Sequence, residues 1–112
     1  DVLILDARSR ARFYGQSPEP RTGIRSGHIP GSINLPFKEV LRDGKFKTKD
    51  ELTEILSQLR IEDQSLIFSC GSGITACIIM LATDLVNSNA KAVYDGSWSE
   101  WGMSDKLPVE LR

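Results

Sequence analysis

The apolar positions of the chain fall into several short continuous runs and one strongly periodic segment. Val2–Leu5, Leu66–Phe68 and Ala92–Tyr94 are continuous apolar runs, and Ser32–Leu35 alternates briefly before Pro36. Apolar runs of this length that are bounded by turn-forming residues are typical of short strands in a protein interior. The pattern therefore predicts four strands spread along the chain.

Two helices are predicted between these strands. Thr48 and Glu51 have the spacing of a capping box, in which each side chain bonds the other residue's backbone amide. The apolar positions that follow have the spacing i, i+3, i+4, i+7 and are Leu52, Ile55, Leu56 and Leu59. The segment from Ile74 to about Val86 is apolar nearly all round, which predicts a buried helix. Strands separated by helices predict an α/β domain with a mainly parallel sheet.

Polar residues follow three of the predicted strands. They are Asp6-Ala7-Arg8, Cys70 and Asp95-Gly96. In parallel sheets, ligands bind outside the carboxyl ends of the strands, so we expect these three ends to form one site. The stretch Gly15–Gly31 holds three prolines and four glycines, which predicts a long irregular loop of the kind that is often functional.

Composition excludes several classes of protein. The chain has 112 residues, which suits one domain, and its net charge of −1 offers no basic field for nucleic acid. No apolar segment reaches the roughly 18 residues of a membrane span. Because the chain opens directly on the strand Val2–Leu5, without a methionine or a signal peptide, we expect it to be part of a longer or processed protein.

The two cysteines, Cys70 and Cys77, predict thiols rather than a disulfide framework. On a helix they would be separated by about 10 Å along the axis, beyond the roughly 7 Å limit between the Cα atoms of a disulfide. Thiols of this kind indicate a reducing compartment, and we expect a cytoplasmic protein. A single histidine and scattered carboxylates offer no metal-ligand spacing, and no cofactor is expected.

Cys70 stands where a predicted buried strand meets a predicted buried helix. Gly71 and Gly73 allow the backbone to turn and leave several amides able to point inward, as in an anion-binding nest. The helix that follows adds unpaired N–H groups and the positive end of its dipole, and these features favour a reactive thiolate. The alternative is that Cys70 is a small packing residue. Packing is the role that we predict for Cys77, which lies among apolar residues.

Three motifs together resemble the rhodanese family: "CGSGITA", "YDGSWSEWG" and "DARSRARFYGQSPEPRTGIRSGHIPGSINLPF". More narrowly, they resemble the C-terminal catalytic domain of 3-mercaptopyruvate sulfurtransferases. The resemblance implies a three-layer fold with a mainly parallel sheet of four to five strands flanked by helices, and it makes residues 1–112 one catalytic domain. Enzymes of this type carry two tandem rhodanese-like domains, so an N-terminal domain of the same protein is an expected partner.

The resemblance also implies a chemistry for Cys70. The cysteine would take sulfur from a small-molecule donor as a persulfide, and a thiol, cyanide or thioredoxin would then remove the outer sulfur. The residues that would surround the persulfide are Gly71, Ser72, Gly73, Ile74 and Thr75. In the family, a serine at the position of Ser72 accompanies 3-mercaptopyruvate, whereas a basic residue accompanies thiosulfate. A site that lacks this cation binds a doubly charged donor less well.

The resemblance assigns the carboxylate and ketone of mercaptopyruvate to Arg12 and to Arg21, which follows "PEP". The fork of arginine suits a planar carboxylate. The alternative is that both are solvated surface residues. Arg8 and Arg10 flank Arg12, and an exchange of roles among the three remains open. The candidate partners of Arg8 in a structural role are Asp6 and Asp95.

Other roles and functions compete with this hypothesis. His28 could pair with a catalytic cysteine, but the resemblance makes it a scaffold residue that ties loops together. A protein-tyrosine phosphatase would need the loop C-x₅-R, and the sixth residue after Cys70 is Ala76, with no arginine in the loop. Two alternatives stay open: a thiosulfate sulfurtransferase, and a module that carries a persulfide or binds a partner with little activity in isolation.

Overall fold

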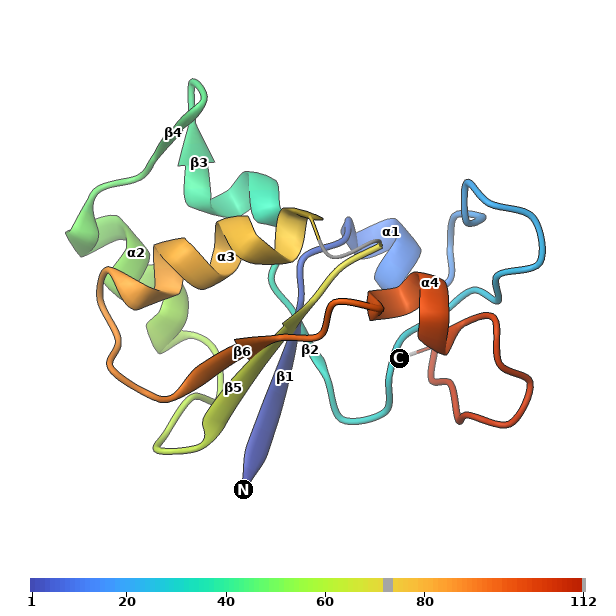
Figure 1. The fold of residues 1–112 in the computed structure, drawn as a ribbon. Helices are drawn as coiled ribbons and strands as arrows, with labels where there is room; N and C mark the ends of the chain where they lie inside the picture. The colour runs from blue at the N-terminus through green and yellow to red at the C-terminus, as the bar shows by residue number, and fades with distance from the viewer. Residues whose placement is uncertain (72–73, 112) are drawn as a thin grey trace.

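A computed structural model describes residues 1–71 and 74–111 of the chain. The main sheet of this part contains four strands: β1 (Val2–Asp6), β2 (Ile33–Asn34), β5 (Ser65–Ser69) and β6 (Lys91–Val93). They lie in the order β2-β1-β5-β6, and every neighbouring pair is parallel (Figure 1). The predicted α/β class, the four strands and the parallel sheet are confirmed.

Two of the helices are those that the sequence predicts, α2 (Lys49–Ser57) and α3 (Ile74–Asp84). The remaining elements are short: α1 (Arg10–Phe13), the 3₁₀ turn η1 (Phe37–Val40), α4 (Ser97–Trp101) and a hairpin of β3 (Leu41–Arg42) and β4 (Lys45–Phe46). Figure 1 shows α2 and α3 along the sheet and α1 and α4 at the carboxyl ends of the strands. The short helices α1 and α4 therefore lie at the edge where a site is expected.

The capping box predicted at Thr48 is present. The Glu51 amide donates to Thr48 Oγ1 at 3.2 Å, and the Thr48 amide donates to Glu51 Oε1 at 3.0 Å. The predicted apolar stripe faces the core, with Leu52 fully buried. Leu59 lies beyond the last residue of α2 but still packs against the core.

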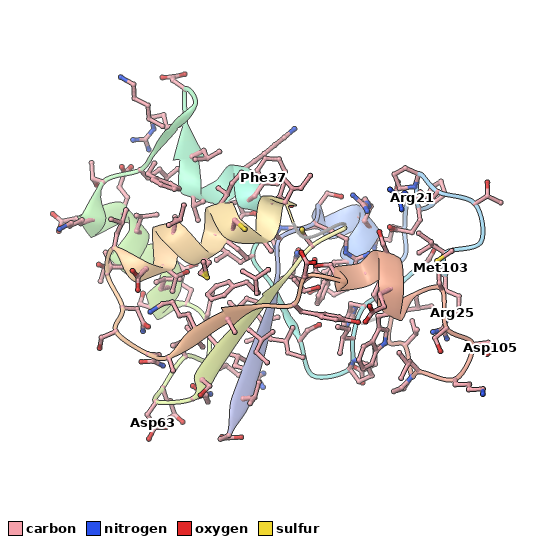
Figure 2. The ribbon with its side chains drawn as sticks, viewed as in Figure 1. Arg21, Arg25, Phe37, Asp63, Met103 and Asp105 are labelled. Atoms are coloured by element: carbon pink, nitrogen blue, oxygen red, sulfur yellow. The ribbon has the colours of Figure 1, made fainter. Side chains whose placement is uncertain are left out.

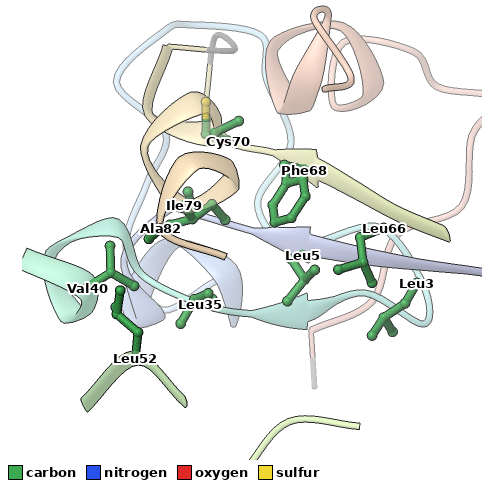
Figure 3. Packing of buried hydrophobic residues seen from close by; sticks show 12 residues of the cluster. Leu3, Leu5, Leu35, Val40, Leu52, Leu66, Phe68, Cys70, Ile79 and Ala82 are labelled. Atoms are coloured by element: carbon green, nitrogen blue, oxygen red, sulfur yellow. The ribbon is translucent and has the colours of Figure 1, made fainter. Parts of the chain in front are cut away.

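One face of the sheet and the helices α2 and α3 enclose the core. Parallel register places Leu3 beside Leu66, and Leu5 beside Phe68, on the same face. The α3 residues in this cluster include Ala76, Ile79 and Ala82. Figure 3 shows Cys70 at one end of the cluster, beyond Phe68. The buried strand β5 thus delivers the cysteine from the core to the sheet edge.

The opposite face is polar and buried at its carboxyl end. Asn34, Asp6 and Ser69 form a row across β2, β1 and β5, and all three are buried. Asn34 Nδ2 donates to the carbonyl oxygens of Asp6 and Arg8 at 3.0 and 2.9 Å. Trp98 of α4 covers Arg8, with the guanidinium carbon 4.6 Å from the ring centroid. The sheet is therefore the middle of three layers.

The prediction that α3 is buried all round is wrong. Its inner face is buried, but the outer face exposes 74% of Ile74 and 54% of Leu81. Cys77 is exposed as well, so its predicted packing role is also wrong. The outer face carries apolar side chains in place of the usual charged ones, and this composition hides the amphipathic pattern from the sequence. No helix in the described ranges is long and apolar enough to span a membrane.

Candidate functional site

The backbone around Cys70 is held by α4. The amide of Trp98 donates to the Cys70 carbonyl at 2.9 Å, and the Cys70 amide donates to Ser97 Oγ at 3.0 Å. The amide and hydroxyl of Ser99 both donate to the Gly71 carbonyl, at 2.8 and 2.6 Å. Cys70 itself is buried, with 1% of its surface exposed. Four hydrogen bonds therefore fix the start of the predicted loop.

The sequence does not predict that Ser97 and Ser99 bond the backbone of Cys70 and Gly71. We call this pair of serines the clamp. Ser97 takes a left-handed backbone conformation, with φ of 51°, and its hydroxyl donates to the Tyr94 carbonyl at 2.7 Å. Non-glycine residues adopt this conformation only rarely. The alternating serines of "GSWSEW" are the only trace of the clamp in the sequence. Short turns in which serines bond the backbone are common, so that trace alone predicts little.

Arg12 of α1 lies directly against the loop. A Cβ atom built on Gly71 would be 2.9 Å from Arg12 Nη2, so the guanidinium and the glycine are in contact. The carboxylate of Glu19 accepts from Arg12 Nη2 at 2.7 Å and from Nε at 3.2 Å. This hydrogen bonding raises the pKa of Arg12, and Cys70 adds a smaller electrostatic contribution in the same direction. Arg12 is therefore a fixed cation beside the cysteine.

The other two arginines of this segment have different roles. Arg8 is buried and donates to both carboxylate oxygens of Asp6, with Nη2 to Oδ2 at 2.8 Å. Asp6 is thus its partner, whereas Asp95 is exposed. Arg10 pairs with Glu39 on the surface at 2.7 Å. Among these three arginines, Arg12 is the one that contacts Gly71.

Arg12 and Arg21 share one hollow with the loop. The hollow has a volume of about 200 Å³, roughly that of six or seven liquid water molecules. Its lining residues are Arg12, Glu19, Pro20, Arg21, Ile24, Gly71 and Ser99. Arg21 is exposed, and Figure 2 shows it at the same end of the molecule as Arg25 and Met103. The structure thus brings together three of the predicted site residues: Arg12, Arg21 and Gly71.

The remaining predicted loop residues are described only in part. Ile74 is the first residue of α3 and is largely exposed, and Thr75 follows it half-buried. Ser72 and Gly73 lie outside the described residues, so the predictions made for them stay sequence-based.

His28 has the surroundings of a scaffold residue. Its ring stacks on Phe13 with 3.7 Å between centroids, and Nδ1 lies 2.7 Å from the Phe13 carbonyl oxygen. Its backbone pairs with Glu110 in an isolated bridge. His28 thus connects α1 to the C-terminal segment.

Comparison with known proteins identifies the family. The model of the Rhodanese-like domain matches residues 1–104, nearly the whole chain. The chain belongs to the rhodanese family. The match confirms the predicted resemblance and fold, with a four-stranded parallel sheet flanked by helices.

Named relatives of this rhodanese domain include two kinds of sulfurtransferase. It is 47% identical to the 3-mercaptopyruvate sulfurtransferase of Escherichia coli K12, covering 96% of the chain and 38% of the relative. It is 45% identical to the thiosulfate sulfurtransferase of Mus musculus, covering 97% and 37%. The chain therefore spans less than two fifths of the length of these relatives.

A solved structure resembles the whole chain. It is the sub-stoichiometric sulfur transferase subunit of yeast mitochondrial complex I, with 41% identity and a TM-score of 0.88. The alignment covers 100% of the rhodanese domain and 39% of that subunit.

Within residues 1–71 and 74–111, no group of three or more histidine, cysteine, aspartate or glutamate side chains could hold a metal ion.

Proposed function

We propose that this rhodanese domain transfers sulfur from 3-mercaptopyruvate to a thiol or cyanide through a persulfide on Cys70. The observation that carries the proposal is the contact between the Arg12 guanidinium and Gly71, the residue after Cys70. Both line a hollow together with Arg21. Arg12, which is paired with Glu19, suits a donor that carries one carboxylate a few bonds from its sulfur.

In the first step, the Cys70 thiolate attacks the thiol sulfur of mercaptopyruvate. An S–S bond forms, and the bond between that sulfur and carbon 3 breaks with its electron pair going to the carbon. The leaving group is the enolate of pyruvate, which takes a proton from water. Arg12 and Arg21 hold the carboxylate so that the sulfur faces Cys70, and orientation of this kind lowers the barrier to reaction.

In the second step, an acceptor thiolate attacks the outer sulfur of the persulfide. The S–S bond breaks, its electron pair returns to Cys70, and the acceptor leaves as a persulfide. Cyanide reacts in the same way and leaves as thiocyanate. The clamp from Ser97 and Ser99 keeps the backbone at Cys70 in place through both steps.

Thiosulfate is the second candidate donor. It would react by the same attack, with sulfite as the leaving group. The similarity to the mouse thiosulfate sulfurtransferase supports this alternative. Two features support mercaptopyruvate instead: Ser72 is not basic, and Arg12 is paired with Glu19. Both limit the positive charge that is available to a dianion.

Partners and location follow as part of the proposal. The acceptor is a thiol such as thioredoxin, and an N-terminal rhodanese-like domain of the same protein completes the site. The cytoplasm is the proposed location, because thiols such as Cys70 and Cys77 persist in reducing compartments.

Intact-mass analysis and turnover test the proposal together. The protein is treated with 3-mercaptopyruvate, and separately with thiosulfate, before and after addition of a thiol acceptor. We expect a gain of one sulfur that the acceptor removes, and no gain in Cys70→Ser. Sulfur bound in the Cys70→Ser variant would overturn the mechanism, and faster turnover of thiosulfate would reject the choice of donor.

The role of Arg12 has a matched control on the same helix. Arg12→Ala is expected to raise KM for mercaptopyruvate roughly tenfold or more, because a charged hydrogen bond to the carboxylate is lost. Arg10→Ala removes the same charge from the surface, where it pairs with Glu39, and should leave KM unchanged. Equal effects of the two substitutions would show that only the net charge of α1 matters.

A further inference from the structure

Glu19 is a buried carboxylate in the irregular loop that holds two arginines at once. Only 2% of its side chain is exposed. Its Oε1 accepts from Arg12 Nη2 at 2.7 Å, and its Oε2 accepts from Arg12 Nε at 3.2 Å and from Arg8 Nη1 at 3.3 Å. A carboxylate is taken out of water only when such partners compensate for its charge.

The same carboxylate connects Arg12 to the interior of the domain. Arg8 is fixed on its far side by Asp6, by the Gly27 carbonyl at 2.7 Å and by the ring of Trp98. Because these contacts hold Arg8, they give Glu19 an anchor, and Glu19 in turn orients the guanidinium of Arg12 against Gly71. Arg12 by itself is 28% exposed and has a long flexible stem, so without this anchor it would sample several orientations.

We propose that Glu19 is the positioning residue that orients Arg12 for the donor carboxylate and, by its negative charge, sets the preference for monoanionic over dianionic donors. This inference rests on the proposed function. Glu19 occupies the Nε and Nη2 groups of Arg12, which leaves Nη1 and the second proton of Nη2 to bind a substrate.

The charge effect follows from the four groups that meet here. Asp6 and Glu19 balance Arg8 and Arg12, so Arg21 is the uncompensated cation among the charged residues described around the hollow. Removing the charge of Glu19 adds one positive charge beside the donor. A dianion such as thiosulfate gains more from that change than the monoanion mercaptopyruvate does.

Two substitutions separate the geometry from the charge. Glu19→Gln keeps the shape and loses the charge, whereas Glu19→Asp keeps the charge and shortens the reach. For each variant, kcat and KM are measured with mercaptopyruvate and with thiosulfate, beside thermal unfolding. Glu39→Gln is the control, because it removes a carboxylate that pairs with an arginine of α1 on the surface.

Both Glu19 variants are expected to raise KM for mercaptopyruvate roughly tenfold with a smaller change in kcat. Only Glu19→Gln should shift the ratio of kcat/KM values toward thiosulfate, by about fivefold or more. Glu39→Gln should change neither quantity by more than about twofold, because exposed ion pairs contribute little. A general loss of folding in Glu19→Gln would instead lower kcat/KM equally for both donors. Glu19→Asp, with its KM-against-kcat split, then tests the positioning role.

A double substitution identifies the route of the effect. If Glu19 acts through Arg12, adding Glu19→Gln to Arg12→Ala should raise KM by less than about twofold more. The inference would be overturned if the KM changes of the two substitutions were fully additive, or if Glu19→Gln left the ratio of kcat/KM for the two donors unchanged. In either case, formation of a persulfide on Cys70 would leave the proposed function standing. Absence of persulfide in the unmodified protein would reject the proposed function itself.

Discussion

Gly71→Ala tests the contact on which the proposed site depends. Its added methyl group would lie 2.9 Å from Arg12 Nη2, a separation that real Cβ atoms essentially never show. The backbone of Gly71 lies outside the left-handed region, so the substitution introduces no strain of its own. The guanidinium of Arg12 must therefore shift, and the shift strains its hydrogen bonds to Glu19 at 2.7 and 3.2 Å.

The magnitude of the change in KM follows from the hydrogen bond that Arg12 is proposed to donate to the donor carboxylate. A hydrogen bond to a charged group contributes roughly 1.5–3 kcal/mol, and about 1.4 kcal/mol corresponds to a tenfold change in affinity. Because the displaced guanidinium no longer donates to the donor carboxylate, Gly71→Ala is expected to raise KM for mercaptopyruvate at least about tenfold. Loss of the bonds to Glu19 should lower the unfolding temperature as well, by roughly 4–8 °C for each kcal/mol lost.

Steady-state kinetics and thermal unfolding, measured on the same preparations, check this expectation. The decisive comparison is the double variant with Arg12→Ala, in which the methyl group has no guanidinium to displace. There the alanine should add less than about twofold to KM. An unchanged KM in Gly71→Ala alone, or an equal effect of the alanine in both backgrounds, would refute the reasoning.

Further predictions address the scaffold and the second cysteine. Thr48→Ala should cost about 1 kcal/mol of unfolding free energy in urea, with activity retained, because the Glu51 amide loses its cap. Hydrogen bonds from Arg42 and from the Thr48 amide lower the pKa of Glu51 to about 2, below its ordinary value of 4.5. The stability that this carboxylate contributes is therefore present above about pH 4.5 and is lost as the pH falls toward 2, and Glu51→Gln should flatten that part of the acid unfolding curve. Cys77→Ser should change stability by no more than about 0.5 kcal/mol and leave persulfide formation intact, because Cys77 is exposed.

The sheet could be predicted because its physics is local. The strands β1, β5 and β6 are short apolar runs that end in polar residues. Each of these patterns can be recognised in the sequence without knowing the fold. The capping box at Thr48 is likewise complete within four residues. Position at the carboxyl end of a strand then placed Cys70 at the ligand-binding edge.

The clamp and the anchor of the site could not be predicted in this way. The helices α1 and α4 have four and five residues, too few to show a helical period. Ser97 and Ser99 act on a loop that is distant in sequence, and Glu19 reaches Arg8 only because the irregular loop returns to the sheet edge. Contacts of this kind depend on the path of a loop, which propensities do not determine.

The loop that carries Glu19 is itself held by a close backbone approach at Gly27. This glycine has φ of +115°, and a Cβ atom there would be 2.6 Å from the Glu110 carbonyl oxygen. Its own carbonyl accepts from Arg8 Nη2, and its neighbour His28 pairs with Glu110. The C-terminal segment, the loop and the buried Arg8 therefore meet at one point. Because Arg8 also donates to Glu19, a disturbance at that point would reach Arg12 and the cysteine through two ion pairs, although Gly27 does not line the hollow.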